Sequence, residues 1–150
     1  MSTVRIRIRR LDSCKDVPLP EYETEGASGM DLRAAVEGKV VLNPGEVRLI
    51  PTGLVVSIPR GYEAQIRPRS GLALKYGVGM VNSPGTIDSD YRGEIGLVMI
   101  NWGQAPFVIQ RGDRVAQMVI SKVTRAEFSE VNDLESTKRG EKGFGHSGVK

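Results

Sequence analysis

The feature that most limits the fold of this chain is the close spacing of its turn signals. Glycine, proline, asparagine and aspartate cluster between residues 43 and 113 in the segments "NPG", "PRG", "NSPG", "DSDYRG", "NWG" and "QRGD". The apolar runs between these segments are too short for helices of ordinary length, so the chain is predicted to be all-β. "QRGD" is expected to be a hairpin turn. "SGLALKYG", residues 70–77, is expected to form one or two helical turns that Ser70 caps and Gly77 ends.

Length and cysteine content narrow the class of protein. The chain has 150 residues, which suits one domain, and no internal repeat divides it. Cys14 is the only cysteine, so an intrachain disulfide is excluded and a reducing, cytoplasmic location is expected. No apolar run has the length of a signal-peptide core or a membrane span. We therefore expect no membrane partner.

The chain is basic, with a formal net charge of +3. The N-terminal "VRIRIRR" is open to two interpretations: a strand with Val4, Ile6 and Ile8 on one face and arginines on the other, or a stripe that binds a phosphate backbone. The alternation favours the strand, and the scattered aromatic residues offer no stacking platform for single-stranded nucleic acid. Nucleic acid is therefore not expected as a partner, whereas a small anionic ligand suits the charge.

The segment "IGLVMI", residues 95–100, departs from the alternation of a half-exposed strand because it is apolar at nearly every position. A β-sandwich of this size buries one face of such a strand in its core. The other face is therefore predicted to be a subunit interface, and the chain a homo-oligomer. The alternative is a central strand that a loop of its own chain covers.

The segment "RPRSGLA", residues 67–73, places two arginines and a hydroxyl at the expected start of the helical turn. Free backbone N–H groups and the local dipole favour an anion at such a position, so the segment suits phosphate. A serine that only caps the turn explains the same pattern, and both interpretations stay open.

The segment "TIDSDYRG", residues 86–93, carries Asp88 at an expected strand end and Asp90 two residues later. Asp88 is either a carboxylate that activates water or part of an acidic turn that bonds its own backbone. Asn82, in the preceding "VNSPG", either presents its amide to the edge of a base or is an ordinary turn residue.

The C-terminal "KRGEKGFGHSGVK", residues 138–150, has the composition of a flexible linker and also that of a loop that wraps phosphates. Its His146 is the only histidine of the chain and has no cysteine or second histidine with which to share a metal ion. Asp31 in "SGMDL" and Gln117 in "RVAQM" are uninformative when each is taken alone.

Together, "SGMDL", "RPRSGLA", "NSPGTIDSDYRGEIG", "RGDRVAQM" and "RGEKGFGHSG" resemble, in order and spacing, the five motifs of the trimeric dUTPase family. The resemblance covers nearly the whole chain, from about Arg5 to Gly148. It implies a distorted jelly-roll β-barrel or sandwich that forms a homotrimer with active sites at subunit interfaces. It divides the chain into a jelly-roll domain, residues 1–138, and a mobile glycine-rich arm, residues 139–150, that closes over the active site.

The implied activity is Mg²⁺-dependent hydrolysis of dUTP to dUMP and pyrophosphate, which keeps uracil out of DNA and supplies dUMP for thymidylate synthesis. In this resemblance Asp88 orients and deprotonates the attacking water. The ion is held mainly by the substrate phosphates and water, and Asp31 acts on it indirectly, through water. The residues implied to bind phosphate oxygens are Arg69, Ser70, Gly71 and Gln117.

Base and sugar recognition follow from the same resemblance. Asn82 and the backbone of Thr86, Ile87 and Asp88 pair with the uracil edge, in a turn too tight for the 5-methyl group of thymine. Tyr91 lies against the deoxyribose and excludes UTP.

The resemblance also gives roles to the arm. Arg139 and Ser147 point toward the phosphates, Phe144 stacks on the uracil ring, and Gly145 allows close backbone approach. Ser147 is the expected γ-phosphate ligand, although His146-Ser147 stands where the family often has Ser-Thr, and Lys142 stands where it usually has glycine.

Two other functions are compatible with the same motifs. A dCTP deaminase of the same superfamily shares the fold and the trimer, but "DSDYRG" favours hydrolysis over deamination. A trimeric nucleotide-binding regulator without catalytic activity keeps the pocket, but the presence of Asp88 favours an enzyme.

Overall fold

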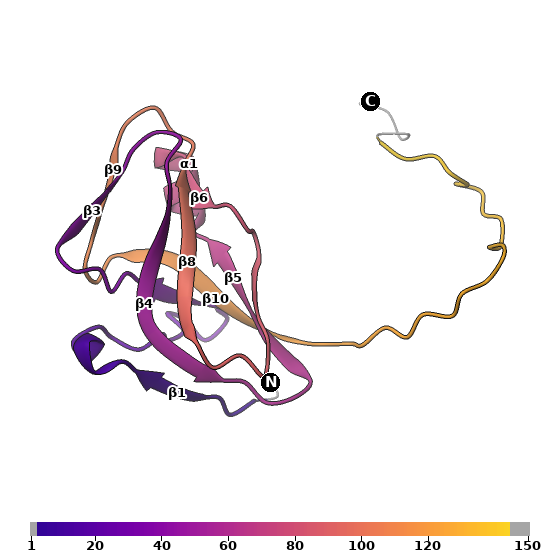
Figure 1. Ribbon diagram of the computed structural model, residues 1–150, viewed down its shortest axis with the longest axis horizontal. Coiled ribbons are helices and arrows are strands. Elements are labelled where there is room, and N and C mark those ends of the chain that lie inside the picture. Colours follow the sequence, from indigo (N-terminus) through magenta and orange to yellow (C-terminus); the bar gives the residue numbers. More distant parts are fainter. Residues whose placement is uncertain (1–2, 145–150) are drawn as a thin grey trace.

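The chain folds into a sandwich of antiparallel strands, and the computed structural model describes residues 3–144 (Figure 1). The strands are β1 Arg7–Arg10, β2 Gly29–Arg33, β3 Lys39–Leu42, β4 Val47–Ser57, β5 Tyr62–Pro68, β6 Val78–Met80, β7 Gly85–Ile87, β8 Glu94–Asn101, β9 Phe107–Gln110 and β10 Arg114–Lys122. One sheet has the order β1-β4-β8-β6 and the other β2-β10-β5-β7, while β3 and β9 form a separate ribbon. The prediction of an all-β jelly-roll fold is confirmed.

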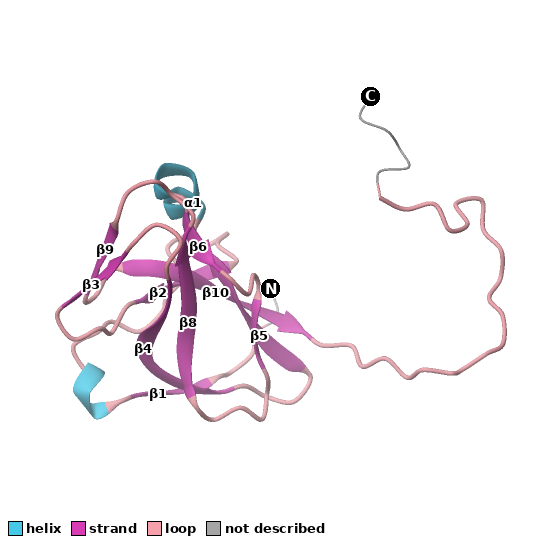
Figure 2. Ribbon diagram, turned by 45° about the horizontal axis from the view of Figure 1, so that its top comes forward, coloured by secondary structure: helices cyan, strands magenta, loops and turns pink. Residues whose placement is uncertain are grey.

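The helices are few and short, as Figure 2 shows. Within residues 3–144 they are a single 3₁₀ turn, η1 Asp12–Cys14, and one α-helix, α1 Ser70–Tyr76. Gly77 ends α1 in the left-handed conformation (φ +66°) and donates its N–H to Ala73 O, as predicted. The prediction that Ser70 caps the helix is wrong. Arg69 is the N-cap residue, because it keeps the extended backbone of β5, and Ser70 is already helical.

The hydrophobic core lies between the two four-stranded sheets. Alternate side chains of β8, namely Ile95, Leu97 and Met99, are completely buried and meet residues of the opposite sheet such as Leu32 and Ile66. Burial of this kind contributes roughly 1.5–3 kcal/mol for each large apolar side chain. The period of two along β8 therefore places it at the centre of the domain.

The opposite face of β8 is also largely apolar and is only partly buried by the described chain. Leu49 of β4 pairs with Val98 of β8 and Val47 pairs with Ile100. Leu49 is 69% exposed and Val47 is 50% exposed, although Leu49 lies over Gly96. The expectation of a second covering layer on this face stays a prediction.

The N-terminal strand is shorter than its sequence pattern suggests. The alternation predicted a strand from Val4, but β1 begins at Arg7, and Ile8 is 36% exposed although it pairs with the buried Val56. β1 is the edge strand of its sheet, so no further strand shields its side chains. Ile6 packs against the core, and Arg7 and Arg9 are exposed.

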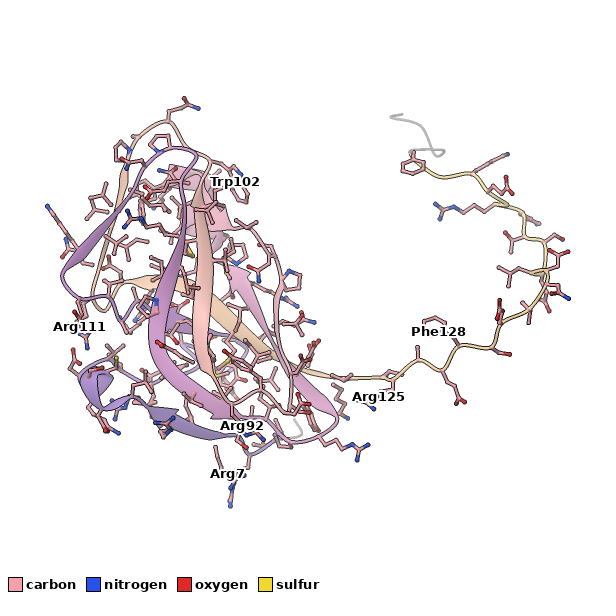
Figure 3. All side chains as sticks on the ribbon, in the orientation of Figure 1. Arg7, Arg92, Trp102, Arg111, Arg125 and Phe128 are labelled. Atoms are coloured by element: carbon pink, nitrogen blue, oxygen red, sulfur yellow. The ribbon has the colours of Figure 1, made fainter. Side chains whose placement is uncertain are left out.

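The "RGD" segment forms the turn between β9 and β10 and anchors the N-terminal region. Arg111, labelled in Figure 3, donates to Asp16 (2.8 Å) and to the carbonyl of Ser13 (2.6 Å). The hydrogen bond from Arg111 lowers the pKa of Asp16 to about 2. Because the pKa of Asp16 is lowered in the folded state, the ionised carboxylate stabilises the fold at pH values above its ordinary pKa. This stabilisation is lost as the pH falls from about 4 toward 2.

The C-terminal segment leaves the domain after β10. Val123 still donates its N–H to Gly61 O (2.9 Å), and the chain then runs away from the sheets, as Figures 1 and 3 show. Phe128 is 96% exposed and Leu134 is 82% exposed. Among the described residues, no helix is long and apolar enough to cross a membrane.

Asn101, at the end of β8, is one of two polar residues that are buried in the part of the chain that the structure describes. Its amide donates to the carbonyls of Leu42 and Ala105 and accepts from the N–H of Gly103, each at 2.8 Å. The side chain therefore ties β3 and the loop after β8 to the core.

We expect Asn101→Ala to lower the free energy of unfolding by about 2–3 kcal/mol, because it leaves buried backbone groups without partners. Asn43→Ala removes an exposed amide that donates to Glu46 and serves as the control, with an expected change within about 0.5 kcal/mol. Urea denaturation measures both. Equal losses in the two variants would contradict the role of the buried amide.

Candidate active site

A cavity of about 220 Å³ opens beside the segment that connects β6 to β7 and the turn after β7. It is lined by Ile66, Met80, Asn82, Gly85, Thr86, Ile87, Asp88, Tyr91, Glu94 and Gly96. Five of the predicted site residues are in this set: Asn82, Thr86, Ile87, Asp88 and Tyr91. The fold therefore brings the predicted base-binding and catalytic residues together around one space.

The strand β7 sets the geometry of this cavity. It pairs with β5 through Ala64↔Ile87 and Gln65↔Thr86 and is the edge strand of its sheet. Backbone groups along the other edge of an outer strand have no strand partner and are free to bond a ligand. Asp88 follows the last residue of β7 directly and is exposed, as expected for a carboxylate at a strand end.

Tyr91 forms one wall of the cavity and is held by its own loop. Its backbone N–H donates to Asp88 O (3.2 Å), and its hydroxyl donates to the carbonyl of Glu94 (2.9 Å). A Cβ at Gly93 would overlap the Tyr91 hydroxyl, so this position suits only glycine. The phenol ring is therefore fixed at both ends while 43% of the residue remains exposed.

A second group of predicted residues forms a chain of alternating charges. Asp31 on β2 pairs with Arg69 (Oδ1 to Nε, 3.0 Å) and with Arg114 (Oδ2 to Nη1, 3.6 Å). Arg114 in turn pairs with Glu23 (3.0 Å). Arg69 also donates to the carbonyl of Arg114 (3.0 Å). The half-buried Asp31 therefore holds the Arg69 guanidinium beside the start of α1.

Ser70 and Gly71, the first two residues of α1, are exposed. The N–H groups of a first helical turn have no acceptor within the helix, which leaves them free for an anion.

Gln117 on β10 lies next to this group. It is the register partner of Asp31 on one side and of Arg67 on the other. Its amide donates to Pro68 O (3.0 Å), and it lines a second cavity of about 410 Å³ together with Gln65, Arg67, Pro68, Ser83 and Pro84. No residue lines both cavities.

The structure does not bring the described part of the arm, residues 139–144, to either cavity. Arg139 donates to Lys142 O within the extended segment (2.9 Å), and Phe144 is fully exposed. Gly145 and Ser147 lie outside the described residues.

Sequence reasoning missed two charged residues of the site. Arg114 was not singled out because strict alternation from Gln117 places Val115 on the same face, whereas a register shift between Arg114 and Ala116 turns Arg114 toward Asp31. Glu94 was not singled out in the sequence, yet it lines the first cavity.

The charged residues do not form a metal cage. Among residues 3–144, no three histidine, cysteine or carboxylate side chains come close enough to share an ion. Both oxygens of Asp31 already face arginines. The donor set therefore fits a divalent ion that arrives on the phosphates of a ligand and reaches the protein through water.

Comparisons with known proteins agree with this geometry. The sequence model of the dUTPase family matches residues 15–148. The deoxyuridine 5'-triphosphate nucleotidohydrolase of Caldanaerobacter subterraneus subsp. tengcongensis is 57% identical over 147 residues, which cover 98% of this chain and 99% of that one. That of Anaeromyxobacter sp. is 57% identical over 146 residues, covering 97% and 98%.

Solved structures give the same result. The dUTPase of Staphylococcus bacteriophage 80alpha with dUPNHPP superimposes with a TM-score of 0.86 and 31% identity, over 98% of this chain and all of that chain. A variant of the dUTPase of phage phi11 of S. aureus, solved with a structural Mg(II) ion, gives 0.77 and 26% identity, over 89% of this chain and all of that one. This chain belongs to the dUTPase family.

Proposed function

We propose that the chain hydrolyses dUTP to dUMP and pyrophosphate, and so keeps uracil out of DNA and supplies dUMP for thymidylate synthesis. The observation that carries this proposal is the first cavity, where an amide, a free strand edge, a tyrosine and a carboxylate surround one small space. Family membership and the shared name of the close relatives support it. Because the substrate is a metabolic nucleotide, we place the activity in the cytoplasm.

Uracil recognition rests on Asn82 and β7 in this proposal. The edge of β7 that does not pair with β5 offers backbone N–H and C=O groups within the Thr86–Ile87 segment, and Asn82 adds a donor and an acceptor. A site that bonds the uracil edge discriminates against cytosine, because mismatched donors leave buried polar groups unpaired. In this proposal the turn around the base is too tight for the methyl group of thymine, and Tyr91 lies beside the sugar where a 2′-hydroxyl would need space.

Catalysis rests on Asp88. Its carboxylate takes a proton from a water molecule, whose oxygen forms a bond to the α-phosphorus. The bond from that phosphorus to the bridging oxygen of the β-phosphate breaks in line, and pyrophosphate carries the electron pair away. The exposure of Asp88 at the end of β7 leaves it accessible to such a water.

Phosphate binding rests on the second group. Arg69, held by Asp31, supplies a charged fork, and Ser70 and Gly71 supply the free N–H groups of the first helical turn. Gln117 adds a neutral donor at the same edge. When bound, Mg²⁺ neutralises charge on the triphosphate, and Asp31 is the residue proposed to meet it through water.

We propose a homotrimer with each active site between subunits. The first cavity is not lined by the residues that bind phosphate in this proposal, and a neighbouring chain would complete a site that holds a whole dUTP molecule. The open apolar face around Leu49 and Val98 gives such an assembly a surface to bury.

The arm, residues 139–150, is proposed to close over the bound nucleotide of a neighbouring subunit, with residues 1–138 as the jelly-roll domain. The departure of the chain from the sheets after β10 gives it the reach for this. Arg139 and Ser147 would meet the phosphates, Phe144 the uracil ring, and Gly145 would allow close approach. Closure would exclude water and align the triphosphate.

A nucleotide panel tests the proposed function. We expect pyrophosphate release from dUTP and little from dCTP, dTTP or UTP, measured with the purified full chain. Ammonia release from dCTP would instead identify a deaminase. Binding of dUTP without turnover would identify a regulator.

The first variant to test is Asp88→Asn, which keeps the shape of the side chain but removes the base. We expect kcat to fall by roughly 10²–10⁴-fold while dUTP binding persists. Asp90→Asn, two residues along the same turn, is the matched control and should retain most of the activity. Near wild-type turnover in Asp88→Asn would remove this residue from the role of base.

Deletion of residues 140–150 tests the arm. We expect an unchanged oligomeric mass by analytical ultracentrifugation and a collapse of turnover, because the open site admits water and leaves the triphosphate unaligned. Deletion of only the last two residues is the control. Full activity after the longer deletion would show that the arm is only a linker.

A further inference from the structure

Glu94 is a carboxylate that lines the first cavity and takes no part in the proposed catalytic steps. It is the first residue of β8, is half-buried and lines the cavity together with Tyr91 and Asp88. Its side chain does not contact a cation among the described residues. Instead, Oε1 accepts the backbone N–H of Gly53 at 2.7 Å, a short, charge-assisted hydrogen bond.

Gly53 lies at an irregularity in β4 that is built rigidly into the domain. The pairing of β4 with β8 is regular up to Pro51↔Gly96 and resumes at Val55↔Glu94, so the chain between them bulges out of the ladder. Gly53 has φ +68°, and a Cβ there would overlap Cys14.

Two more hydrogen bonds fasten the bulge. The carbonyl of Gly53 accepts the N–H of Leu11 (2.8 Å). The buried hydroxyl of Thr52 donates to Ile95 O (2.6 Å). The Glu94 carboxylate is therefore attached to a fixed point of the β1–β4–β8 sheet.

The backbone carbonyl of the same Glu94 holds the tyrosine wall of the cavity. It accepts the Tyr91 hydroxyl at 2.9 Å, and Gly93 provides the space for this contact. Arg92, at the end of the domain where Figure 3 labels it, closes the loop by donating to the carbonyls of Ser89 and Tyr91 at 2.7 Å each. The position of the Tyr91 ring thus depends on where Glu94 lies.

We propose that Glu94 determines the selectivity of the site for deoxyribose over ribose, by fixing the 88–94 segment to the bulge of β4 and so holding Tyr91 against the 2′ position of the sugar. The proposal rests on the proposed hydrolysis of dUTP. Glu94 is a positioning residue: it acts through Tyr91 and does not touch the reacting atoms.

The test compares kcat/KM for dUTP with kcat/KM for UTP. Glu94→Ala removes the acceptor for Gly53, and we expect the dUTP to UTP ratio to fall by roughly 10-fold or more, the scale of one lost discriminating contact. Glu94→Gln keeps an oxygen that accepts the Gly53 N–H, so it should restore most of the ratio. Glu46→Ala is the matched control, because Glu46 also accepts a backbone N–H, that of Asn43, away from the cavity.

A double-mutant cycle with Tyr91→Phe separates positioning from general loosening. Loss of the hydroxyl breaks the bond to the Glu94 carbonyl, so we expect a lower ratio in Tyr91→Phe and little further loss when Glu94→Ala is added. Equal declines for both nucleotides in Glu94→Ala, with the ratio unchanged, would overturn the proposal, as would full additivity in the cycle. Thermal unfolding confirms that each variant is folded.

The wild-type measurement keeps this inference distinct from the proposed function. A chain that hydrolyses dUTP selectively, with an unchanged ratio in Glu94→Ala, refutes the role of Glu94 alone. A wild-type chain that turns over dUTP and UTP equally refutes the role of Tyr91 and that of Glu94 with it. Absence of dUTP hydrolysis refutes the proposed function.

Discussion

The antiparallel pairing of β4 with β8 is the interaction on which the rest of the domain depends. These are long strands that sit side by side in the first sheet, and the buried face of β8 provides the centre of the core. The irregularity between Pro51 and Val55 also connects this strand pair to the site, because it leaves the N–H of Gly53 free to donate to the Glu94 carboxylate. The turn that carries Asp88 and Tyr91 enters β8 at this point. Core packing and site geometry are thus joined in one strand pair.

The charged residues of the site are held by one another before any ligand arrives. Asp31 forms ion pairs with Arg69 and Arg114, and Arg114 also forms an ion pair with Glu23. An isolated surface pair of this kind contributes little to stability, commonly below about 1 kcal/mol. Its value lies in orientation: a guanidinium that is already placed loses less conformational freedom when a phosphate binds. The alternation of charge also keeps Arg69 and Arg114 together despite their repulsion.

Much of the fold could be predicted from local patterns, because turns and buried strands depend on residues that are close in sequence. Gly77 ended the only α-helix among residues 3–144, and Asp88 followed a strand end, as expected. Ser70 did not cap that helix, because Arg69, which is extended and paired with Asp31, takes the N-cap position. The strand predicted from Val4 begins only at Arg7, at the edge of its sheet. These errors share a cause: neighbours from distant parts of the chain decided the outcome.

By itself, the sequence determined the all-β class, the order of the site segments and the side chains available for chemistry. These features depend only on the identity of residues that are close together in the sequence. Only the tertiary structure decided that Asn82, Asp88 and Tyr91 share one cavity while Asp31 and Arg69 lie in another place. It alone joined Glu94 to Gly53, 41 residues away in the sequence, across an irregular strand pair. Strand register and bulges depend on the packing of the whole core, so contacts of this kind have no signature in any short segment.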